Sequence, residues 1–428
     1  MPPDTADAEG SSGEGAVVTG VACGSSHSLA LLGSRGLVVS WGRGEDGQLG
    51  HGDAEERTQP QAIFGLLNAA VSSVYCGAEY SLAISRSRRE VWSWGWGDFG
   101  RLGHGDATDK FVPTPIAAFS GTPVAAAACG DTHTLVLSEA GEVWAFGRNQ
   151  NGQLGTGSDV DSVLPQKVAA LEGKRVVSVA CGAEHSVCCT DQGEVYAWGW
   201  GRYGNLGDGE CSDRRLPVKV KGLEGVRVAQ VACGWRHSAA VDDAGRLYVW
   251  GWGRWGQLGL GDCNDAWVPR QVAGLQDIAL VAGGWRHMLA ADSSGAVWAW
   301  GWGKFGQLGL GNNQDVVESP QRLEALSGER AVRLASGWRH SMVATQSGKV
   351  YTWGRGVNGQ LGHGDSNDYN VPKLLGALSS GSLSVDALSR EAVHPSVKYS
   401  VPAADRYAVV PDSGQDDAAV PDSKRLRV

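Results

Sequence analysis

The chain has 428 residues, 42% of them hydrophobic, and a formal net charge of −9 at pH 7. This length and apolar content support a large buried core and exclude a wholly disordered polymer. The acidic balance argues against binding along nucleic-acid backbones, which depends on clustered Lys and Arg, so association with chromatin would need a local basic patch. Sixty-three glycines beside 18 tryptophans and only 3 methionines favour a turn-rich all-β protein, because glycine serves turns whereas tryptophan fills space rigidly.

Residues 1–15, MPPDTADAEGSSGEG, contain four acidic residues and neither a basic residue nor an apolar core. Such a segment is neither a signal peptide nor a transit peptide, and we expect a disordered acidic tail. No later run reaches the length of a transmembrane helix, so we expect a cytoplasmic and nuclear protein without a membrane partner. The nine cysteines should be reduced, because five of them recur at one position of a repeat instead of pairing by spacing. These five are Cys23, Cys76, Cys129, Cys181 and Cys233.

From residue 16 onward, one unit of 50 to 53 residues is repeated seven times. One marker of the unit is the tetrapeptide Gly-Gln-Leu-Gly or a close variant of it. Its first glycine is Gly47, Gly100, Gly152, Gly204, Gly256, Gly306 and Gly359. A second marker is a small residue and a glycine shortly before a histidine. That position is occupied by His27, Tyr80, His133, His185, His237, His287 and His340.

Each unit contains short apolar runs separated by Gly, Asp and Ser clusters, which predicts four short strands joined by tight turns. Radial repetition of four-stranded units hides sheet edges, so we predict an all-β fold, a seven-bladed β-propeller over residues 16–378. The run PKLL at 372–375 matches PQKV at 165–168, which we interpret as the strand that opens a blade. Because no such strand precedes Val17, we expect the two ends of the propeller to share a blade.

Several repeated residues are interpreted as structural. A strand-ending tryptophan should pack the blades in six units, with Phe146 in the remaining one; the six are Trp41, Trp94, Trp198, Trp250, Trp300 and Trp353. The repeated histidines should be buried, hydrogen-bonded groups rather than metal ligands, because ring symmetry keeps them one blade apart. The GxGxxG patterns at 42–47 and 95–100 recur in phase with the blades, so their glycines are assigned to turns and not to a nucleotide site. No catalytic triad, paired carboxylate or zinc spacing stands out, so we expect no enzyme, no catalytic residues and no metal.

Three positions differ from blade to blade. Two residues after the strand-ending aromatic residue, the units carry Arg43, Trp96, Arg148, Trp200, Trp252, Trp302 and Arg355. After the small-Gly pair they carry Ser25, Ala78, Asp131, Ala183, Trp235, Trp285 and Trp338. The next position holds Ser26, Glu79, Thr132, Glu184, Arg236, Arg286 and Arg339. A position that accepts either Trp or Arg should lie at a surface or its edge.

Acidic and basic residues are separated around this ring. Acids lie on blades two to four, whereas Arg236, Arg286 and Arg339 lie on blades five to seven. A face with an acidic half and a basic half complements itself when a second copy is laid on it through a two-fold axis, so we predict a homodimer. The alternative, a solvated polar face, leaves a large exposed tryptophan patch unexplained.

Residues 379–428 are rich in Ser, Asp, Val and Pro and contain few large apolar residues, so we expect a flexible tail. Val-Pro pairs occur at 401–402, 410–411 and 420–421. Proline pre-sets an extended ligand at low entropy cost, which favours a partner-binding tail. The alternative is an inert linker.

The seven in-phase units resemble the regulator-of-chromosome-condensation propeller family over residues 16–378. Within that family, Gly-Trp-Arg-His at 234–237, 284–287 and 337–340 and YAVVPD at 407–412 are similar to the plant ultraviolet-B receptors. The resemblance implies a photoreceptor whose own tryptophans absorb, without an added cofactor. It implies that light converts a salt-bridged dark homodimer into monomers, which bind an E3 ubiquitin ligase of the photomorphogenesis pathway and signal to transcription. Propeller-type repressor proteins that restore the dimer are a further implied partner.

The resemblance also assigns site residues. The implied chromophore is Trp235, Trp285 and Trp338, with Trp96 approaching from the partner subunit. Arg286 and Arg339 are matched with Asp98 and Asp109, and Arg148 is matched with Glu184; the implied dimer interface also contains Arg236, Trp200, Trp252 and Trp302. Val410 and Pro411 are the implied ligase anchor. Phe146 and Tyr399 stand where the family has tryptophan, and Lys110 beside Asp109 softens one pair, which affects auxiliary light harvesting more than the switch.

Two rival functions come with the same fold. A guanine-nucleotide exchange factor for the small GTPase Ran, bound to chromatin, predicts a basic amino-terminal tail, whereas this one is acidic. A substrate-binding module of a ubiquitin ligase predicts an attached catalytic domain, which these 428 residues do not contain.

Overall fold

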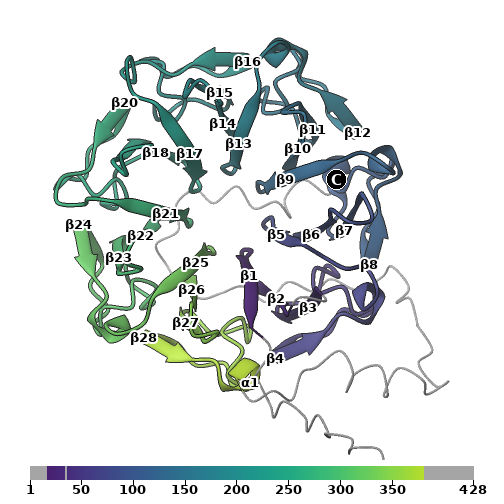
Figure 1. Cartoon of the computed structure of the whole chain (residues 1–428), viewed down its shortest axis with the longest axis vertical. Helices are drawn as coiled ribbons and strands as arrows, with labels where there is room; N and C mark the ends of the chain where they lie inside the picture. The colour runs from purple at the N-terminus through teal and green to yellow at the C-terminus, as the bar shows by residue number, and fades with distance from the viewer. Residues whose placement is uncertain (1–16, 34–35, 380–428) are drawn as a thin grey trace, which may run out of the picture.

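A computed structural model describes residues 17–33 and 36–379. These residues form seven four-stranded sheets arranged around one axis, and Figure 1 shows the sheets as the blades of a ring. The predicted all-β, seven-bladed propeller is confirmed. The predicted tails at 1–15 and 379–428 lie outside the described residues except for residue 379, so the boundaries drawn for them stay predictions.

Each blade consists of four consecutive strands, counted from the axis outward. Blades one to three contain β1 (Val18–Cys23), β2 (His27–Leu32), β3 (Leu37–Gly42), β4 (Arg57–Ala62), β5 (Ser73–Cys76), β6 (Tyr80–Ser85), β7 (Glu90–Gly95), β8 (Lys110–Pro115), β9 (Val124–Cys129), β10 (His133–Ser138), β11 (Val143–Gly147) and β12 (Ser162–Lys167). Blades four and five contain β13 (Val176–Cys181), β14 (His185–Thr190), β15 (Val195–Gly199), β16 (Arg214–Lys219), β17 (Val228–Cys233), β18 (His237–Asp242), β19 (Leu247–Gly251) and β20 (Ala266–Gln271). Blades six and seven contain β21 (Ile278–Gly283), β22 (His287–Asp292), β23 (Val297–Trp302), β24 (Val316–Arg322), β25 (Ala331–Ser336), β26 (His340–Thr345), β27 (Val350–Gly354) and β28 (Tyr369–Leu374). The short helical turns are η1 (Phe64–Leu66), η2 (Asp98–Gly100), η3 (Ala117–Phe119), η4 (Ala169–Leu171), η5 (Glu324–Leu326) and α1 (Gly376–Ser379).

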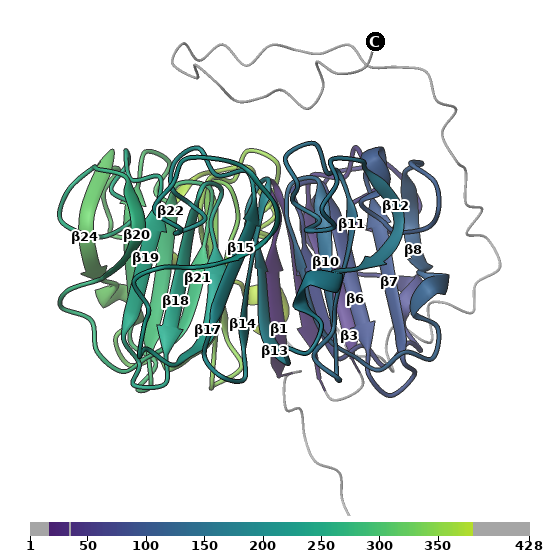
Figure 2. The ribbon, with the colours of Figure 1, turned by 90° about the horizontal axis from the view of Figure 1, so that it is seen from above.

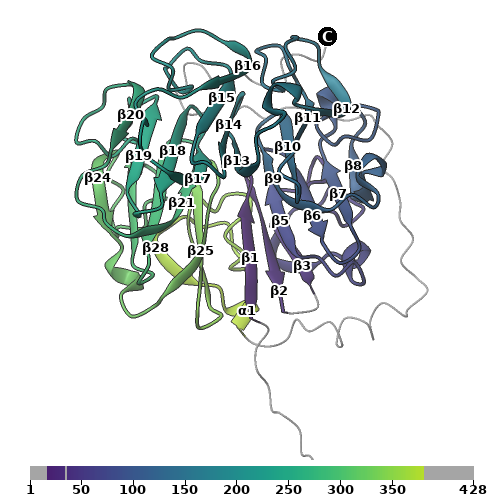
Figure 3. The same cartoon turned by 45° about the horizontal axis from the view of Figure 1, so that its top comes forward.

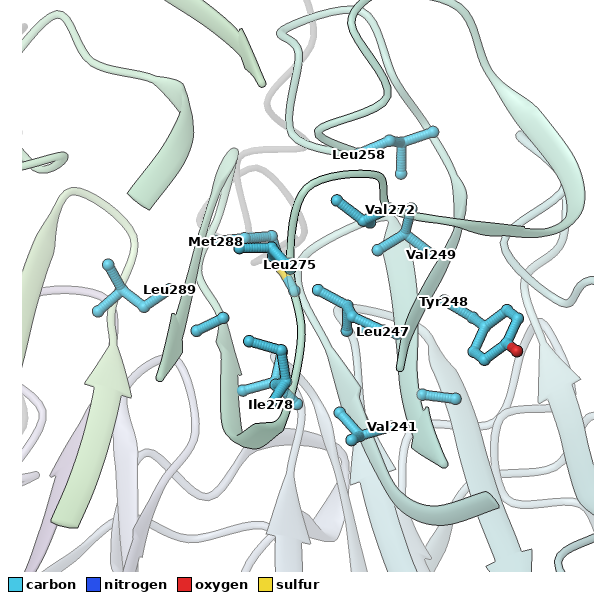
Figure 4. Close-up of a cluster of buried hydrophobic side chains, with 14 of the residues drawn as sticks. Val241, Leu247, Tyr248, Val249, Leu258, Val272, Leu275, Ile278, Met288 and Leu289 are labelled. Atoms are coloured by element: carbon cyan, nitrogen blue, oxygen red, sulfur yellow. The ribbon is translucent and has the colours of Figure 1, made fainter. Parts of the chain in front are cut away.

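The core lies between neighbouring blades. The second strand of a blade, such as β2 with the sequence HSLALL, is buried along its whole length. Both of its faces meet another blade, which explains a continuous apolar run in place of strict alternation. Figure 4 shows this packing between blades five and six, where Leu247 and Val249 lie near Leu275 and Met288. The packed blades hold the connecting loops at the two ends of the strands, which form the two faces of the ring in Figure 2.

The ring closes differently from the sequence-based expectation. Strand β28, which contains Pro372, is the outermost strand of blade seven, and blade one is already complete with β1 to β4. The proline-bearing strand therefore ends each blade, where the missing N–H faces outward without breaking a ladder. Pro60 in β4 provides this strand for blade one, so the expectation of a shared blade is wrong. Inner strands line the axis (Figure 1 and Figure 3), and β1 packs directly against β25 and β26.

A ring of hydrogen bonds joins each blade to the next. Six buried histidines, called the histidine ring below, are His27, His133, His185, His237, His287 and His340. The Nε2 atoms of five of them lie 2.9–3.1 Å from a serine Oγ of the next blade, and that of His237 lies 3.0 Å from the sulfur of Met288. In blade two, the Tyr80 hydroxyl donates to the His133 carbonyl at 2.7 Å. The prediction that these histidines are buried, hydrogen-bonded structural groups is confirmed.

The strand-ending tryptophans join blades in a second way. All six are fully buried, and each indole Nε1 donates to a backbone carbonyl of the preceding blade at 2.8–3.0 Å. The acceptors belong to the Gln or Asn of the Gly-Gln-Leu-Gly loops. Phe146 is equally buried but has no donor, so blade three is held at this position by packing alone. The assignment of these residues to blade packing is confirmed.

Candidate functional site

The three variable positions of the repeat lie on one face of the ring. Because the strands of a blade are antiparallel, the turn between its first and second strands and the loop between its third and fourth strands lie at the same end. In blade five, the backbone N–H of Trp252 donates to the Arg236 carbonyl at 2.9 Å, which joins the turn to the loop. We call the surface formed by these turns and loops the tryptophan face.

Trp285 is the centre of an indole cluster on this face. The Trp235 ring meets it edge-on, with centroids 5.7 Å apart and an interplanar angle of 71°. Trp338 stacks on it at 5.8 Å and 25°, and Trp302 meets it edge-on at 5.5 Å. Trp252 extends the cluster from Trp235 at 5.7 Å. The structure thus brings together Trp235, Trp285 and Trp338, whereas their role as a chromophore stays a prediction.

Most of these indoles are buried within a single propeller. Trp285 is 2% exposed, and Trp96, Trp252 and Trp302 are 5%, 8% and 6% exposed. The expectation of a large exposed tryptophan patch is therefore wrong for these residues, although the Trp-or-Arg position does lie on one face of the ring. The reason is that neighbouring indoles and arginines cover one another. A second copy is not needed to remove them from water.

Arginines form this cover by stacking on the indoles. The Arg286 guanidinium carbon lies 3.8 Å from the centre of the Trp285 ring and 5.2 Å from that of Trp302. Arg236 lies 3.8 Å from Trp235, and Arg339 lies 5.0 Å from Trp285. A guanidinium over an indole face is attracted by about 0.5–2 kcal/mol, depending on how dry the site is. Arg286, only 7% exposed, is therefore part of the packing of the cluster as well as a charge on the face.

The contact between neighbouring blades changes its chemistry around the face. In blades three and four, Arg148 Nη1 lies 3.3 Å from Glu184 Oε1, which is an ion pair within one chain. In blades four and five, the equivalent positions hold Trp200 and Arg236, and the guanidinium lies 4.6 Å from the indole centre. Ion pairs thus join blade one to two and blade three to four, whereas cation–π contacts join blade four to five and blade five to six. The acidic and basic residues of the face are therefore separated around the ring, as the sequence indicated.

A small cavity of about 140 Å³ lies on the axis beside the cluster. Its wall includes Asp131 and Trp235 and the five repeated cysteines. Burial and the neighbouring Glu184 raise the pKa of Asp131 to about 7, although the Trp235 indole donates to its carboxylate and Arg101 attracts it. All nine cysteines are free thiols, as predicted, and burial raises the pKa of Cys129 to about 12.

The predicted carboxylates of blade two lie at the acidic side of the face. Asp98 begins η2, and Asp109 Oδ1 accepts a hydrogen bond from the Gly97 N–H at 2.9 Å. Trp96 lies beside them under Arg101, whose guanidinium carbon is 4.0 Å from the ring centre. Arg286 and Arg339 belong to blades six and seven, so their matching with these carboxylates across two copies stays a prediction.

Residues 2–278 and 120–389 match the model of the RCC1-like domain. The chain belongs to the RCC1-like domain family. The ultraviolet-B receptor UVR8 of Arabidopsis thaliana is 48% identical over 422 residues, which are 95% of this chain and 96% of UVR8. The E3 ubiquitin-protein ligase HERC2 of Homo sapiens is 33% identical over 359 residues, which are 83% of this chain and 6% of HERC2. The crystal structure of Prp20p from Saccharomyces cerevisiae, studied with its binding to Gsp1p and histones, is similar with a TM-score of 0.71 and 26% identity, and covers 81% of this chain and 87% of Prp20p.

A second aromatic position, which was not predicted from the sequence, accompanies the variable tryptophans in this RCC1-like propeller. The residue before the Gly-x-Leu-Gly motif is Phe99, Tyr203, Trp255 or Phe305 in the four blades that carry the variable tryptophan. Tyr203 stacks on Trp252 at 5.6 Å and 24°, and Phe305 meets Trp302 edge-on at 5.3 Å. The coincidence of two aromatic positions in the same four units is a signal that the sequence contained.

The remaining predictions concern the tail, metal binding and the membrane. Val410, Pro411 and Tyr399 fall outside the described ranges. Within 17–33 and 36–379, no cluster of His, Cys, Asp or Glu has the arrangement of a metal site. None of the helices in the same ranges is long and apolar enough to cross a membrane.

Proposed function

We propose that this RCC1-like propeller is an ultraviolet-B photoreceptor whose chromophore is the indole cluster of the tryptophan face. The observation that carries the proposal is the contact of Trp285 with Trp235 and Trp338 at centroid separations of 5.7 and 5.8 Å. Tryptophan is the side chain that absorbs most strongly toward the ultraviolet-B edge, and indoles in contact couple electronically, which extends absorption to longer wavelength. Identity of 48% with UVR8 over 95% of the chain supports the same function. No added chromophore and no enzymatic step are required.

The arginines link absorption to charge. An excited indole is a strong electron donor, and the Arg286 guanidinium, 3.8 Å from the Trp285 ring, is the adjacent positive charge. Transfer of one electron from the excited indole to the guanidinium neutralises Arg286 and leaves the positive charge on Trp285, so the charge moves away from the carboxylate and the attraction, which falls with distance, weakens until the electron returns. Absorption in Trp285 is thereby converted into weaker ion pairing at the face.

In the dark, two propellers lie face to face through a two-fold axis. Arg286 and Arg339 of one copy meet Asp98 and Asp109 of the other, while the Arg148–Glu184 pair borders the contact. Exposed pairs contribute only about 0–1 kcal/mol each, so the dimer depends on many modest terms that fail together. Trp96 of each copy approaches the indole cluster of the other.

The monomer then signals through its tail. Val410-Pro411, within the segment similar to plant ultraviolet-B receptors, anchors an E3 ubiquitin ligase of the photomorphogenesis pathway, and the complex acts on transcription in the nucleus. Repressor propellers restore the dimer in the cytoplasm and nucleus.

Gel filtration of the purified chain before and after ultraviolet-B exposure tests this proposal. We expect a dimer in the dark at micromolar concentration and low salt, and a monomer after exposure. High salt should weaken the dark dimer, because rim pairs are screened. A dark monomer at low salt, or a dimer unchanged by light, contradicts the proposal. Acceleration of guanine-nucleotide release from Ran by the same sample would instead support the exchange-factor function.

A further inference from the structure

A buried glutamine organises the loop between the third and fourth strands in five blades. Its Oε1 accepts a hydrogen bond from the backbone N–H two residues earlier, at 2.8–3.0 Å. The five glutamines are Gln48, Gln153, Gln257, Gln307 and Gln360, and the donors are Asp46, Asn151, Trp255, Phe305 and Asn358. This bond fixes the orientation of the peptide that precedes each donor residue.

Blade two has Arg101 at the glutamine position. A guanidinium has five donors and no acceptor, so it cannot receive the N–H of Phe99. Instead, Arg101 Nε donates to the Asp98 carbonyl at 2.9 Å, which belongs to the same peptide as that N–H. The Asp98–Phe99 peptide is therefore turned over relative to the glutamine blades. Phe99 has φ 64° and ψ 2°, as at the third residue of a type II turn, where glycine is normally needed. None of the five donor residues of the glutamine blades has a positive φ.

This arrangement is costly within the propeller. Phe99 occupies the left-handed region, which is unfavourable for a residue with a Cβ. Arg101 is fully buried, and burial lowers its pKa to about 10, so it remains a desolvated cation at neutral pH. Arg101 Nη2 is a buried donor with no acceptor among the described residues, but so are the Nε2 atoms of three of the five glutamines, so the costs particular to blade two are the buried cation and the left-handed conformation of Phe99. Local departures of this kind are expected where a residue serves function rather than stability.

The same arginine connects the groups at the acidic corner of the tryptophan face. Its guanidinium stacks at 4.0 Å on Trp96, and its Nη1 donates to the Asp131 carbonyl of blade three at 3.0 Å. The turned peptide places the Phe99 ring 5.0 Å from Arg148, the partner of Glu184. We propose that Arg101 is a positioning residue that presents Trp96 and Asp98 to a second copy of this chain, an inference that rests on the dimer of the proposed function.

The variant Arg101→Gln tests this role, because it restores the glutamine found in five other blades. We expect the fold to be kept and the unfolding temperature to be unchanged or higher. The variant removes the buried cation and lets the backbone of Phe99 leave the left-handed region. The dark dimer should nevertheless weaken by about tenfold for each copy of the site, and hence about a hundredfold overall, because a two-fold interface contains the site twice. Near-ultraviolet circular dichroism of the monomer in high salt provides a second readout. The band that Trp96→Phe removes from the unaltered protein, and which therefore belongs to Trp96, should be changed in Arg101→Gln.

The outcomes separate the two proposals. If the unaltered protein is a monomer in the dark, the proposed dimer fails and the role of Arg101 falls with it. If the unaltered protein is a light-sensitive dimer and Arg101→Gln dimerises with the same dissociation constant, only the positioning role is overturned. A lower unfolding temperature together with a weaker dimer would assign Arg101 to ordinary structural support. Arg101→Lys, which keeps a donor for the Asp98 carbonyl, should retain most of the dimer affinity.

Discussion

Lowering the pH from 7.5 to 5.5 should strongly destabilise this propeller through the histidine ring. Burial lowers the pKa of His27, His133, His185, His237 and His287 from 6.5 to about 3, and that of His340 to about 4. The folded state thus binds fewer protons than the unfolded state between pH 3 and 6.5, so stability is complete above pH 6.5 and is lost as the pH falls.

The magnitude follows from the same shifts. Between pH 7.5 and 5.5, each unfolded imidazole gains about 1.3 kcal/mol by protonation, and the six together roughly 8 kcal/mol. Asp131 opposes this by about 2 kcal/mol, because its raised pKa of about 7 stabilises the folded state as the pH falls toward 5.5. The remaining loss is comparable to the whole stability of a typical domain, about 5–15 kcal/mol.

Proton uptake on unfolding in urea at pH 5.5, followed with an indicator dye, measures this directly and needs no two-state assumption. The informative comparison is His185→Gln, whose side-chain amide can still bond to the Ser238 hydroxyl but cannot titrate. The variant should take up about 0.9 fewer protons than the unaltered chain, because an unfolded histidine is about nine-tenths protonated at this pH. Equal uptake by the two proteins would refute a neutral, buried His185.

Three further predictions concern the tryptophan face. Trp285→Phe should keep the fold and the dark dimer but lose the ultraviolet-B response, because phenylalanine absorbs little ultraviolet-B light. Trp300→Phe, within the blade core, is the control that should keep the response, and light-induced monomerisation of Trp285→Phe equal to that of the unaltered protein on gel filtration would reject Trp285 as a sensor. Arg286→Ala should give a dark monomer by sedimentation and lower the unfolding temperature modestly, because about 0.5–2 kcal/mol of stacking on Trp285 is lost with the charge. The control is Arg330→Ala, an exposed arginine directly before β25, at the end of the strands opposite the tryptophan face; a fully dimeric Arg286 variant in high salt would contradict the interface role. Asp131→Asn should stabilise the fold more at pH 7.5 than at pH 5.5, by roughly 2 kcal/mol, since the Asp131 carboxyl titrates between these values and the asparagine amide does not. Calorimetric unfolding with the same pH dependence as the unaltered protein would show that the pKa of Asp131 is not raised.

The sequence by itself determined the repeat and everything that depends on the repeat alone. Seven in-phase copies of Gly-x-Leu-Gly require seven similar units, and a strand-ending tryptophan or histidine that recurs in each unit must occupy an equivalent interior position. The predicted seven blades, the packing role of Trp300 and the structural role of His185 followed from this, and all three are confirmed. The polarity of the tryptophan face was also visible, because it is a difference between aligned positions.

Only the tertiary structure decided which strands pair and which variable residues are covered. The proline-bearing strand has the same sequence whether it opens or ends a blade, and strand pairing across a loop selects the second alternative, so Pro372 belongs to blade seven. The burial of Trp252 depends on Tyr203 and Trp235, which come from other turns and from another blade. The turned peptide at Phe99 likewise depends on where the Arg101 donors find acceptors. These outcomes are set by contacts between segments distant in the chain, and a local pattern does not contain them.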